Sequence, residues 1–199
     1  MNKMKRETVY REILYDVIER KRRVITQREV SKRCSVSVGL VSFALRPLRR
    51  MGSIVVSRRN FIVQDPWKIL MYWCSIRNLQ RYIIYSNFLR MNVQQIEASL
   101  PHDSIPTAYT AYRELFKDTP ADYSEVYVYG KEQDFINIFG KENSNRANLF
   151  VLRTDDHLIS IGKPTLAQIY VDLWNIGTWY ARRFLTSLEA RIKDILGES

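Results

Sequence analysis

The sequence predicts an α+β / α/β chain in two parts: a small helical domain that ends in a β-hairpin (1–64) and a mixed α/β domain (65–199). Three observations lead to this prediction. Apolar residues repeat at helical spacing up to residue 51, and strand-like runs follow Gly52. Beyond residue 65, helix-like and strand-like stretches alternate, which is typical of α/β domains. The excess positive charge is confined to the first part.

The N-terminal part begins with two predicted helices. In residues 7–22, apolar positions recur at helical spacing, acidic residues lie early and a basic run lies at the end, as the helix dipole favours. That run, Arg20–Arg23, is either a set of phosphate contacts or a solvated helix end. A short second helix follows, because Thr26 and Glu29 have the spacing of a capping box.

The third predicted helix, about residues 37–50, carries the clearest pattern. Ser37 occupies the N-cap position after a tight turn at Cys34–Val36, and Gly52 lies where a helix usually stops. Pro47 removes one backbone hydrogen bond and predicts a bend. One apolar stripe predicts the buried face: Val36, Val41, Leu45, Leu48 and Met51.

The opposite face of this helix would carry small residues, one aromatic ring and guanidinium groups. Arginine can pair with guanine through two hydrogen bonds, and an apolar side chain can contact a thymine methyl, so the face suits the floor of a DNA major groove. The alternative is an amphipathic core helix with a solvated basic face. Under the DNA interpretation, the base-reading residues are Val38, Gly39, Ser42, Phe43 and Arg46.

A β-hairpin is predicted directly after this helix. Residues 54–56 and 61–63 are strand-like, and the turn between them, 57–60, holds two arginines and an asparagine. Such a tip can lie along a phosphate backbone or in a minor groove. The residues expected to hold phosphates are Thr26, Gln27, Arg28, Lys32, Ser37, Arg49, Arg50, Arg58, Arg59 and Asn60.

The charge distribution points to a polyanionic partner. Residues 1–64 hold 16 Lys and Arg against five Asp and Glu, a balance of +11, whereas residues 65–199 hold 15 against 16, a balance of −1. Because the basic residues belong to a patterned domain and not to one amphipathic helix, nucleic acid is favoured over a membrane surface.

Together these features resemble the winged helix-turn-helix family of transcription regulators. The resemblance covers residues 7–64 and is carried by the Thr26–Glu29 cap, the VSVGLVSFAL core pattern, the LRRMG exit and the IVVSRRNFIV hairpin. It implies sequence-directed binding of double-stranded DNA. Since such regulators commonly bind palindromes as dimers, it also implies a homodimer.

The second part begins at Asp65 and Pro66, which suit the N-cap and N1 positions of a helix. No internal repeat is present. The predicted helices span 66–79, 92–100, 105–116, 131–140, 164–177 and 178–196, and the predicted strands span 81–88, 124–130 and 148–154.

This part resembles the C-terminal domain of AbiEi-type antitoxins, which are abortive-infection (type IV) proteins that also carry an N-terminal winged helix. The resemblance covers about 65–196 and is carried by SIPTAYTAYREL, SEVYVYG, ANLFVLRTDDHLI and the stretch from Lys163 to Ile192. It implies a nucleotidyltransferase-like toxin protein as partner and repression of the antitoxin's own promoter. The nearest matches are Asn148, Asp155 or Asp156, Pro164, Gln168, Tyr170, Asp172 and Leu173.

No motif predicts catalytic residues, a metal or a cofactor, so we do not expect an enzyme. The Gly-Ser pair and Asp-x-Asp of a nucleotidyltransferase are missing, as are a P-loop and a GxGxxG, and two Cys and two His are too few and scattered for zinc. Asp155–Asp156 is expected to form a turn, and His157 to lie on the surface. A nuclease remains an alternative if carboxylates gather from Glu125, Asp134 and Asp155.

Two further expectations concern four aromatic residues and the cellular location of the protein. Four aromatic residues near the C-terminus predict either a ligand pocket or, more commonly, core or dimer packing: Trp174, Trp179, Tyr180 and Phe184. No apolar run reaches the roughly 18 residues of a membrane span, and the N-terminus has no apolar signal core. We therefore expect a cytoplasmic protein without membrane contact.

Overall fold

The computed structural model describes residues 3–141 and 146–197, which form two compact units. The first unit contains the chain up to Arg77 together with Thr165–Val171 and the segment from Ile192 onward. The second contains Asn78–Pro164 and Asp172–Arg191. The chain is mixed α and β with two small sheets, as the sequence predicts at that level.

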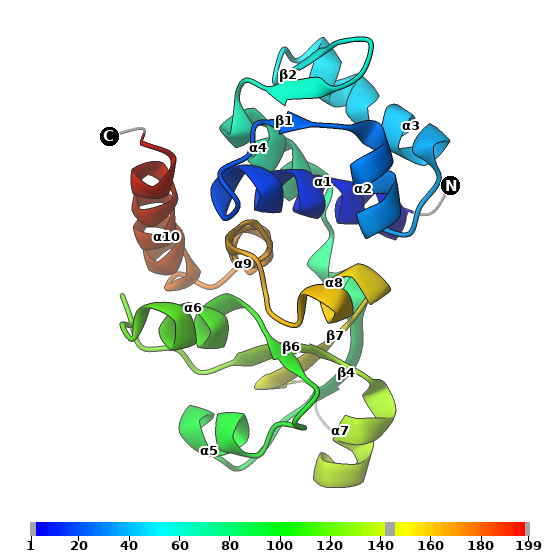
Figure 1. The fold of residues 1–199 in the computed structure, drawn as a ribbon. Coiled ribbons are helices and arrows are strands. Elements are labelled where there is room, and N and C mark those ends of the chain that lie inside the picture. The colour runs from blue at the N-terminus through cyan, green and yellow to red at the C-terminus, as the bar shows by residue number, and fades with distance from the viewer. Residues whose placement is uncertain (1–2, 142–145, 198–199) are drawn as a thin grey trace. The chain divides into compact units, whose positions relative to one another are not determined.

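Up to Arg77, the described part of the first unit combines four helices with a three-stranded sheet (Figure 1). The sheet has the order β1-β3-β2, and both pairings are antiparallel, with Ile25 opposite Phe61 and Val55 opposite Ile62. Its elements are α1 (Lys3–Ile18), β1 (Val24–Ile25), α2 (Gln27–Arg33), α3 (Val38–Arg50), β2 (Ile54–Val56), β3 (Phe61–Val63) and α4 (Pro66–Ile76).

The core of this unit forms where α1 packs against α2, α3 and α4. The apolar positions predicted for the first helix are buried, and the fully buried Trp73 of α4 joins them. Two later segments complete the unit. Gln168 Oε1 accepts a hydrogen bond from Arg11 Nε at 2.8 Å, and the Tyr170 ring meets the Trp67 ring edge-on at 6.0 Å between centroids.

Three details of this unit differ from the sequence prediction. Helix α1 spans Lys3–Ile18 and not 7–22, and Lys21 adopts a left-handed conformation (φ 57°) that takes the chain out of the helix. The chain then returns as strand β1, which was not predicted. Helix α4 packs against α1, so the first compact unit extends past the boundary expected at residue 65.

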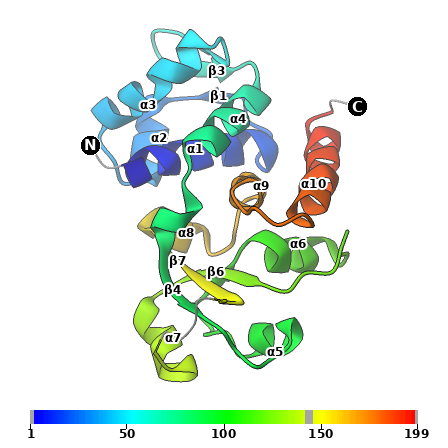
Figure 2. The same ribbon diagram turned by 180° about the vertical axis from the view of Figure 1, so that it is seen from behind.

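The second unit is built on a four-stranded sheet of order β4-β7-β6-β5, in which β6 and β7 are parallel and the other pairs antiparallel. Figures 1 and 2 show α5 and α7 on one face and α6 and α8 on the other. Its elements are a 3₁₀ turn (Leu79–Tyr82), β4 (Ile83–Asn87), α5 (Val93–Ala98), β5 (Ile105–Pro106), α6 (Ala108–Phe116), β6 (Val126–Gly130), α7 (Glu132–Phe139), β7 (Leu149–Arg153) and α8 (Asp156–Ile161). Helices α9 (Leu166–Trp174) and α10 (Ala181–Leu196) are each divided between the two units.

One face of this sheet is covered by an apolar core, and a buried carboxylate lies on the other. The apolar core contains Tyr85, Ile96, Val126, Val128, Phe135, Leu149 and Val151. On the other face, the fully buried Asp172 carboxylate accepts hydrogen bonds from Thr107 Oγ1 at 2.8 Å and from the Tyr129 hydroxyl at 2.5 Å. These bonds satisfy a carboxylate that would otherwise be costly to bury.

The expectations for Asp155–Asp156 and His157 were wrong. Asp155 is the N-cap of α8, its Oδ1 accepting from the Leu158 N–H at 2.9 Å, so the pair opens a helix instead of forming a turn. His157, in the first turn of that helix, is 4% exposed and therefore buried. Residues 105–116, predicted as one helix, form the short strand β5 and then α6. Among the described residues, no helix combines the length and the apolar character needed to cross a bilayer.

Candidate nucleic-acid interface

Helix α3 has one buried face and one exposed face. Ser37 caps its start, the hydroxyl accepting from the Leu40 N–H at 3.2 Å, and Gly52, with φ +70°, follows its end. The buried residues are Val41, Ala44, Leu45 and Leu48, whereas Val36 and Met51 are half-buried. The predicted burial is therefore confirmed for the centre of the stripe, whereas the two residues at its ends are only partly buried.

The exposed face carries four of the five residues predicted to read bases. Val38 is 44% exposed, and Gly39, Ser42 and Arg46 are exposed as well. A Cβ added at Gly39 would meet nothing nearer than Ser37 Oγ at 3.9 Å, so the surface is open there. The fifth residue, Phe43, is half-buried and therefore less exposed than the other four; it lies at the edge of this face, beside two arginines.

The cations predicted to hold phosphates come from α2, α3 and the β2–β3 turn. Helix α3 packs against α2 on one side and against β2, which leads into the turn. The exposed cations are Arg28 and Lys32 on α2, Arg49 and Arg50 at the end of α3, and Arg58 and Arg59 in the turn. The turn is closed by the Ser57 N–H donating to the Asn60 carbonyl oxygen at 2.8 Å. The uncharged members are Gln27 and Asn60, both half-buried.

Thr26 and Ser37 are already used within the protein. Thr26 Oγ1 accepts from the Glu29 N–H at 3.1 Å, and Glu29 Oε2 accepts from the Thr26 N–H at 2.9 Å, which confirms the predicted capping box. The backbone hydrogen bond from Thr26, followed by the Arg22 guanidinium, lowers the pKa of the Glu29 carboxyl to about 2. Both hydroxyls therefore serve first as helix caps.

The basic run 20–23, for which the sequence left phosphate contacts and a solvated helix end as alternatives, makes contacts within the protein, and so does Arg33. Arg20 and Arg33 each bind two carboxylates that are almost fully buried, those of Glu12 and Asp16. Arg22 Nη2 lies 2.9 Å from Glu29 Oε1, and Lys21 and Arg23 donate to carbonyl oxygens within the same unit. These cations are held in place by the protein itself.

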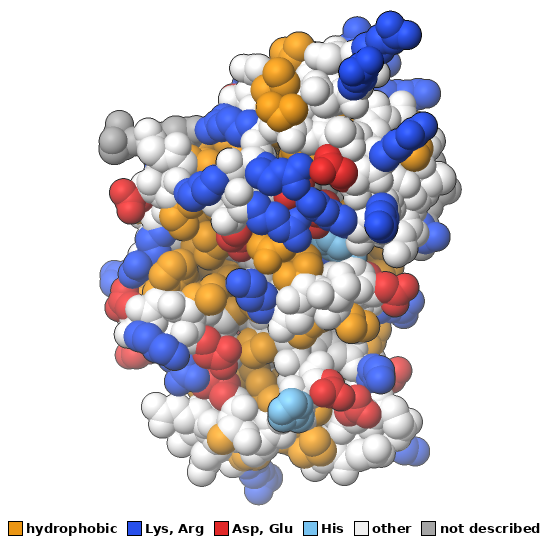
Figure 3. Space-filling view, viewed as in Figure 1, with side chains coloured by type: hydrophobic (Ala, Val, Ile, Leu, Met, Phe, Trp, Pro, Cys, Tyr) orange, Lys and Arg blue, Asp and Glu red, His pale blue; other side chains and the backbone are white. Residues whose placement is uncertain are grey.

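Exposed basic residues on α2, α3 and the β2–β3 turn give the first unit a basic surface. On the face drawn in Figure 3, Lys and Arg side chains gather over this unit with few acidic side chains among them. Arg6, in the first turns of α1, lies beside Phe43, with its Cζ atom 5.7 Å from the ring centroid. Sequence reasoning missed Arg6 because it began the first helix at residue 7.

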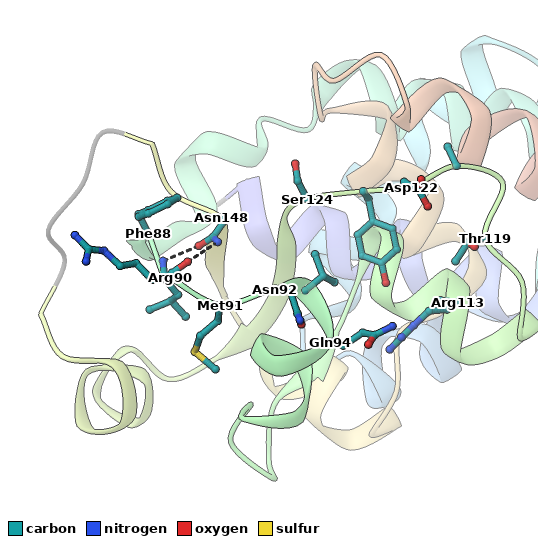
Figure 4. Close-up of a pocket in the computed structure, with 14 residues that line it drawn as sticks. Phe88, Arg90, Met91, Asn92, Gln94, Arg113, Thr119, Asp122, Ser124 and Asn148 are labelled. Carbon is teal, nitrogen blue, oxygen red and sulfur yellow. Dashed lines mark hydrogen bonds between the residues drawn. The ribbon is translucent and has the colours of Figure 1, made fainter.

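The second unit holds a separate hollow of about 880 Å³ (Figure 4). Phe88, Arg90 and Met91 lie toward one end, and Arg113 lies toward the other. Its wall is fixed by Asn148, whose side chain accepts from the Leu89 N–H at 2.8 Å and donates to the Leu89 carbonyl oxygen at 2.9 Å. The mixed polar and apolar lining suits a small organic ligand or a peptide.

A hydrogen bond and an ion pair also fix the side chains at the Arg113 end of this hollow. The Tyr123 hydroxyl donates to Glu97 Oε1 at 2.8 Å, and Arg113 Nη2 lies 2.6 Å from Glu97 Oε2. Burial, followed by the hydrogen bond to Glu97, raises the pKa of Tyr123, so its hydroxyl stays protonated at neutral pH. The wall therefore presents a fixed arginine and a neutral phenol.

The remaining candidate residues do not form one site. Trp174 and Trp179 are 49% and 72% exposed, whereas Tyr180 and Phe184 are buried and pack around Tyr109. Of the three carboxylates weighed for a nuclease, Glu125 accepts from the Tyr180 hydroxyl, Asp155 caps α8, and Asp134 lies in the first turn of α7. Within residues 3–141 and 146–197, no group of three or more His, Cys, Asp or Glu is arranged to hold a metal ion.

Comparison of the chain with protein-family models, with curated proteins and with solved structures gives no significant match.

Proposed function

We propose that the protein is a transcription regulator that binds double-stranded DNA in a sequence-dependent way through its first unit. In this proposal α3 enters the major groove and the β2–β3 turn lies along the backbone or in the minor groove. The order of elements supports it. A helix, a short strand, two helices and a β-hairpin that closes a three-stranded sheet form the arrangement expected of a winged helix.

The observation that carries the proposal is the exposed face of α3. A helix of 13 residues is about 20 Å long, and its exposed side begins with small residues and ends with arginines. Small residues let the helix backbone approach the base edges closely. Arg46 can form a bidentate pair with guanine, and Val38 can contact a thymine methyl.

The free cations around α3 supply the electrostatic part of binding. Helix α2, which packs against α3, exposes Arg28 and Lys32. The turn that follows β2, a strand in contact with α3, exposes Arg58 and Arg59. Contacts from such positions to phosphates fix the register of the helix but carry no sequence information. Sequence preference therefore depends on Val38, Gly39, Ser42 and Arg46.

Selection from a random pool of duplex DNA tests this proposal. We expect repeated rounds with the full-length protein to enrich one motif, and a palindromic motif if the protein acts as a homodimer. Substituting Ser42 and Arg46 together by alanine should abolish the enrichment while leaving retention of DNA at low salt. A pool that stays random with the wild-type protein contradicts the proposal.

A second candidate function is supported by the second unit. Trp179 is 72% exposed, and the Arg183 guanidinium lies 5.8 Å from its ring centroid, beside a hollow of about 630 Å³ that Pro120 and Ala190 help to line. Exposed Trp and Arg side chains are typical of the energetic centre of protein–protein interfaces.

This surface supports an antitoxin-like role, in which the second unit binds and neutralises a toxin protein and the first unit represses the shared promoter. Copurification of the product of the neighbouring gene with the wild-type protein, and its loss with Trp179→Ala, would support this role. Equal copurification with both proteins would contradict it.

A further inference from the structure

We infer that Arg6 and Arg50 bind one backbone phosphate of DNA in a hollow beside α3, and that Phe43 supports the arginines and does not read a base. The inference rests on the proposed function and adds a phosphate site to it. The hollow, about 530 Å³ in volume, lies within the first unit. The residues that matter in its lining are Arg6, Phe43, Arg46, Arg50 and Tyr72.

The hollow runs along the border of the exposed face of α3. Phe43, Arg46, Pro47 and Arg50 stand at positions i, i+3, i+4 and i+7, which place them on one stripe of the helix. Arg46 of this stripe is also four residues after Ser42, so it adjoins the face that carries Ser42. A ligand in the hollow would therefore be next to the residues proposed to contact bases, as a backbone phosphate is next to the groove.

The Phe43 ring holds two of the guanidinium groups. The Cζ atom of Arg6 lies 5.7 Å from the ring centroid, and that of Arg46 lies 5.4 Å from it. Both distances are within the range of a cation–π interaction. Because a half-buried ring between two cations is turned toward its neighbours, Phe43 is a poor candidate for contact with a thymine methyl.

The three guanidinium groups at this hollow differ from those of Arg20 and Arg33. Arg20 and Arg33 are neutralised by buried carboxylates, but among the described residues no carboxylate pairs with Arg6, Arg46 or Arg50. The Arg6 Nε atom is buried and has no hydrogen-bond partner there either. Unsatisfied buried donors are rare, and clustered cations repel one another, so an anion bound here would satisfy the Arg6 Nε donor and offset the repulsion.

A phosphate diester matches this requirement. Guanidinium groups form paired, charge-assisted hydrogen bonds with phosphate oxygens. Arg6 comes from α1 and Arg50 from the end of α3, so a shared phosphate would fix α3 relative to the duplex from two elements at once. Such a contact strengthens binding to every sequence alike.

The test compares Arg6→Gln with Lys5→Gln on a random-sequence duplex and on the selected motif, across a salt series. Lys5 is exposed on the same helix and does not line the hollow. Lys5→Gln therefore removes the same charge as Arg6→Gln, but from outside the proposed site. We expect Arg6→Gln to weaken binding to both duplexes roughly tenfold. It should also lower the slope of log K against log salt by about 0.9, the value for one phosphate, whereas Lys5→Gln leaves the slope unchanged.

Phe43→Leu provides a second, independent variant. The comparison uses the random-sequence duplex, on which base reading by Arg46 gives no preference. If the ring acts there by holding Arg6, Phe43→Leu weakens binding, and the double variant with Arg6→Gln is no weaker than Arg6→Gln alone. Additive losses, or an Arg6→Gln protein that behaves like Lys5→Gln, overturn the phosphate site while leaving DNA binding intact. A wild-type protein that binds neither duplex overturns the proposed function and the phosphate site together.

Discussion

Arg33 Nη1 donates hydrogen bonds to both carboxylate oxygens of Asp16, at 2.8 and 2.9 Å. The Asp16 side chain is fully buried, whereas the Arg33 side chain is 33% exposed. Arg20 Nη1 adds a third bond to the same carboxylate at 2.9 Å. Because these two arginines neutralise a buried acid, they belong to the framework of the first unit and not to its cationic surface.

Replacing Asp16 should therefore reduce stability more than replacing an exposed acid. We expect Asp16→Asn to lower the free energy of unfolding by about 2 kcal/mol, because it weakens charge-assisted hydrogen bonds to a buried group. Asp118→Asn is the control, since Asp118 is 54% exposed and pairs with Arg191 at 3.2 Å; its effect should stay within about 0.5 kcal/mol. Urea unfolding measures both, and equal shifts would contradict the structural role of Asp16.

The Thr26–Glu29 capping box predicts a pH dependence of stability. The folded-state pKa of Glu29 is about 2, below the ordinary value of about 4.3, because of the hydrogen bond from the Thr26 N–H and then Arg22. Its contribution is therefore complete above about pH 4.3 and is lost as the pH falls toward 2. Because the Arg22 and Glu29 side chains are each 38% exposed, we expect less than about 1 kcal/mol.

Glu29→Gln tests this dependence. The difference in unfolding free energy between wild type and variant should be largest near neutral pH and should shrink steadily in more acidic solution. A difference that is constant, or that grows on acidification, would show that the carboxylate form of Glu29 does not stabilise the cap.

Arg46 and Arg58 should differ in how they affect DNA binding. Arg46 lies on the exposed face of α3, and Arg58 lies in the hairpin turn. We expect Arg46→Ala to cost about 1–3 kcal/mol on the preferred sequence and to relax preference, whereas Arg58→Ala weakens binding to all sequences similarly. Fluorescence anisotropy with preferred and random duplexes separates the two. Equal losses on every duplex for both variants would remove Arg46 from the base-reading residues.

Two glycines should respond in opposite ways to alanine. A Cβ at Gly130 would lie 2.6 Å from Cε2 of the fully buried Phe135, so Gly130→Ala should destabilise the protein by about 1–3 kcal/mol. Gly39 is in a helix with open space around it, so Gly39→Ala should stabilise by up to about 1 kcal/mol. Thermal melting of both variants decides this, and a neutral Gly130→Ala would mean that Phe135 moves freely.

Local signals in the sequence predicted much of the first unit. The capping box, the Ser37 cap, the centre of the buried face of α3 and the two hairpin strands each depend on residues within a few positions of one another, and each is confirmed. Strand β1 has only two residues, Val24–Ile25, and owes its existence to pairing with β3. No pattern in two residues can predict a partner that lies more than 30 residues away.

The candidate site was predicted less completely, for a similar reason. Spacing on α3 correctly identified the residues opposite the buried stripe, but it gave no information on which arginines meet carboxylates from another helix. The pairing of Arg33 with Asp16 and the approach of Arg6 to Phe43 are both long-range contacts. The burial of Asp16 could have been suspected, because it lies three residues after the buried Ile13, at the spacing of one helix face.

The central claim is sequence-dependent binding of double-stranded DNA by the first unit. The most direct measurement is the affinity of the full-length protein for the duplex upstream of its own gene and for a random duplex, across a salt series. We predict tight and preferential binding to the upstream duplex, with affinity that falls steeply as salt rises. Weak binding that is equal on both duplexes at every salt concentration would contradict the claim.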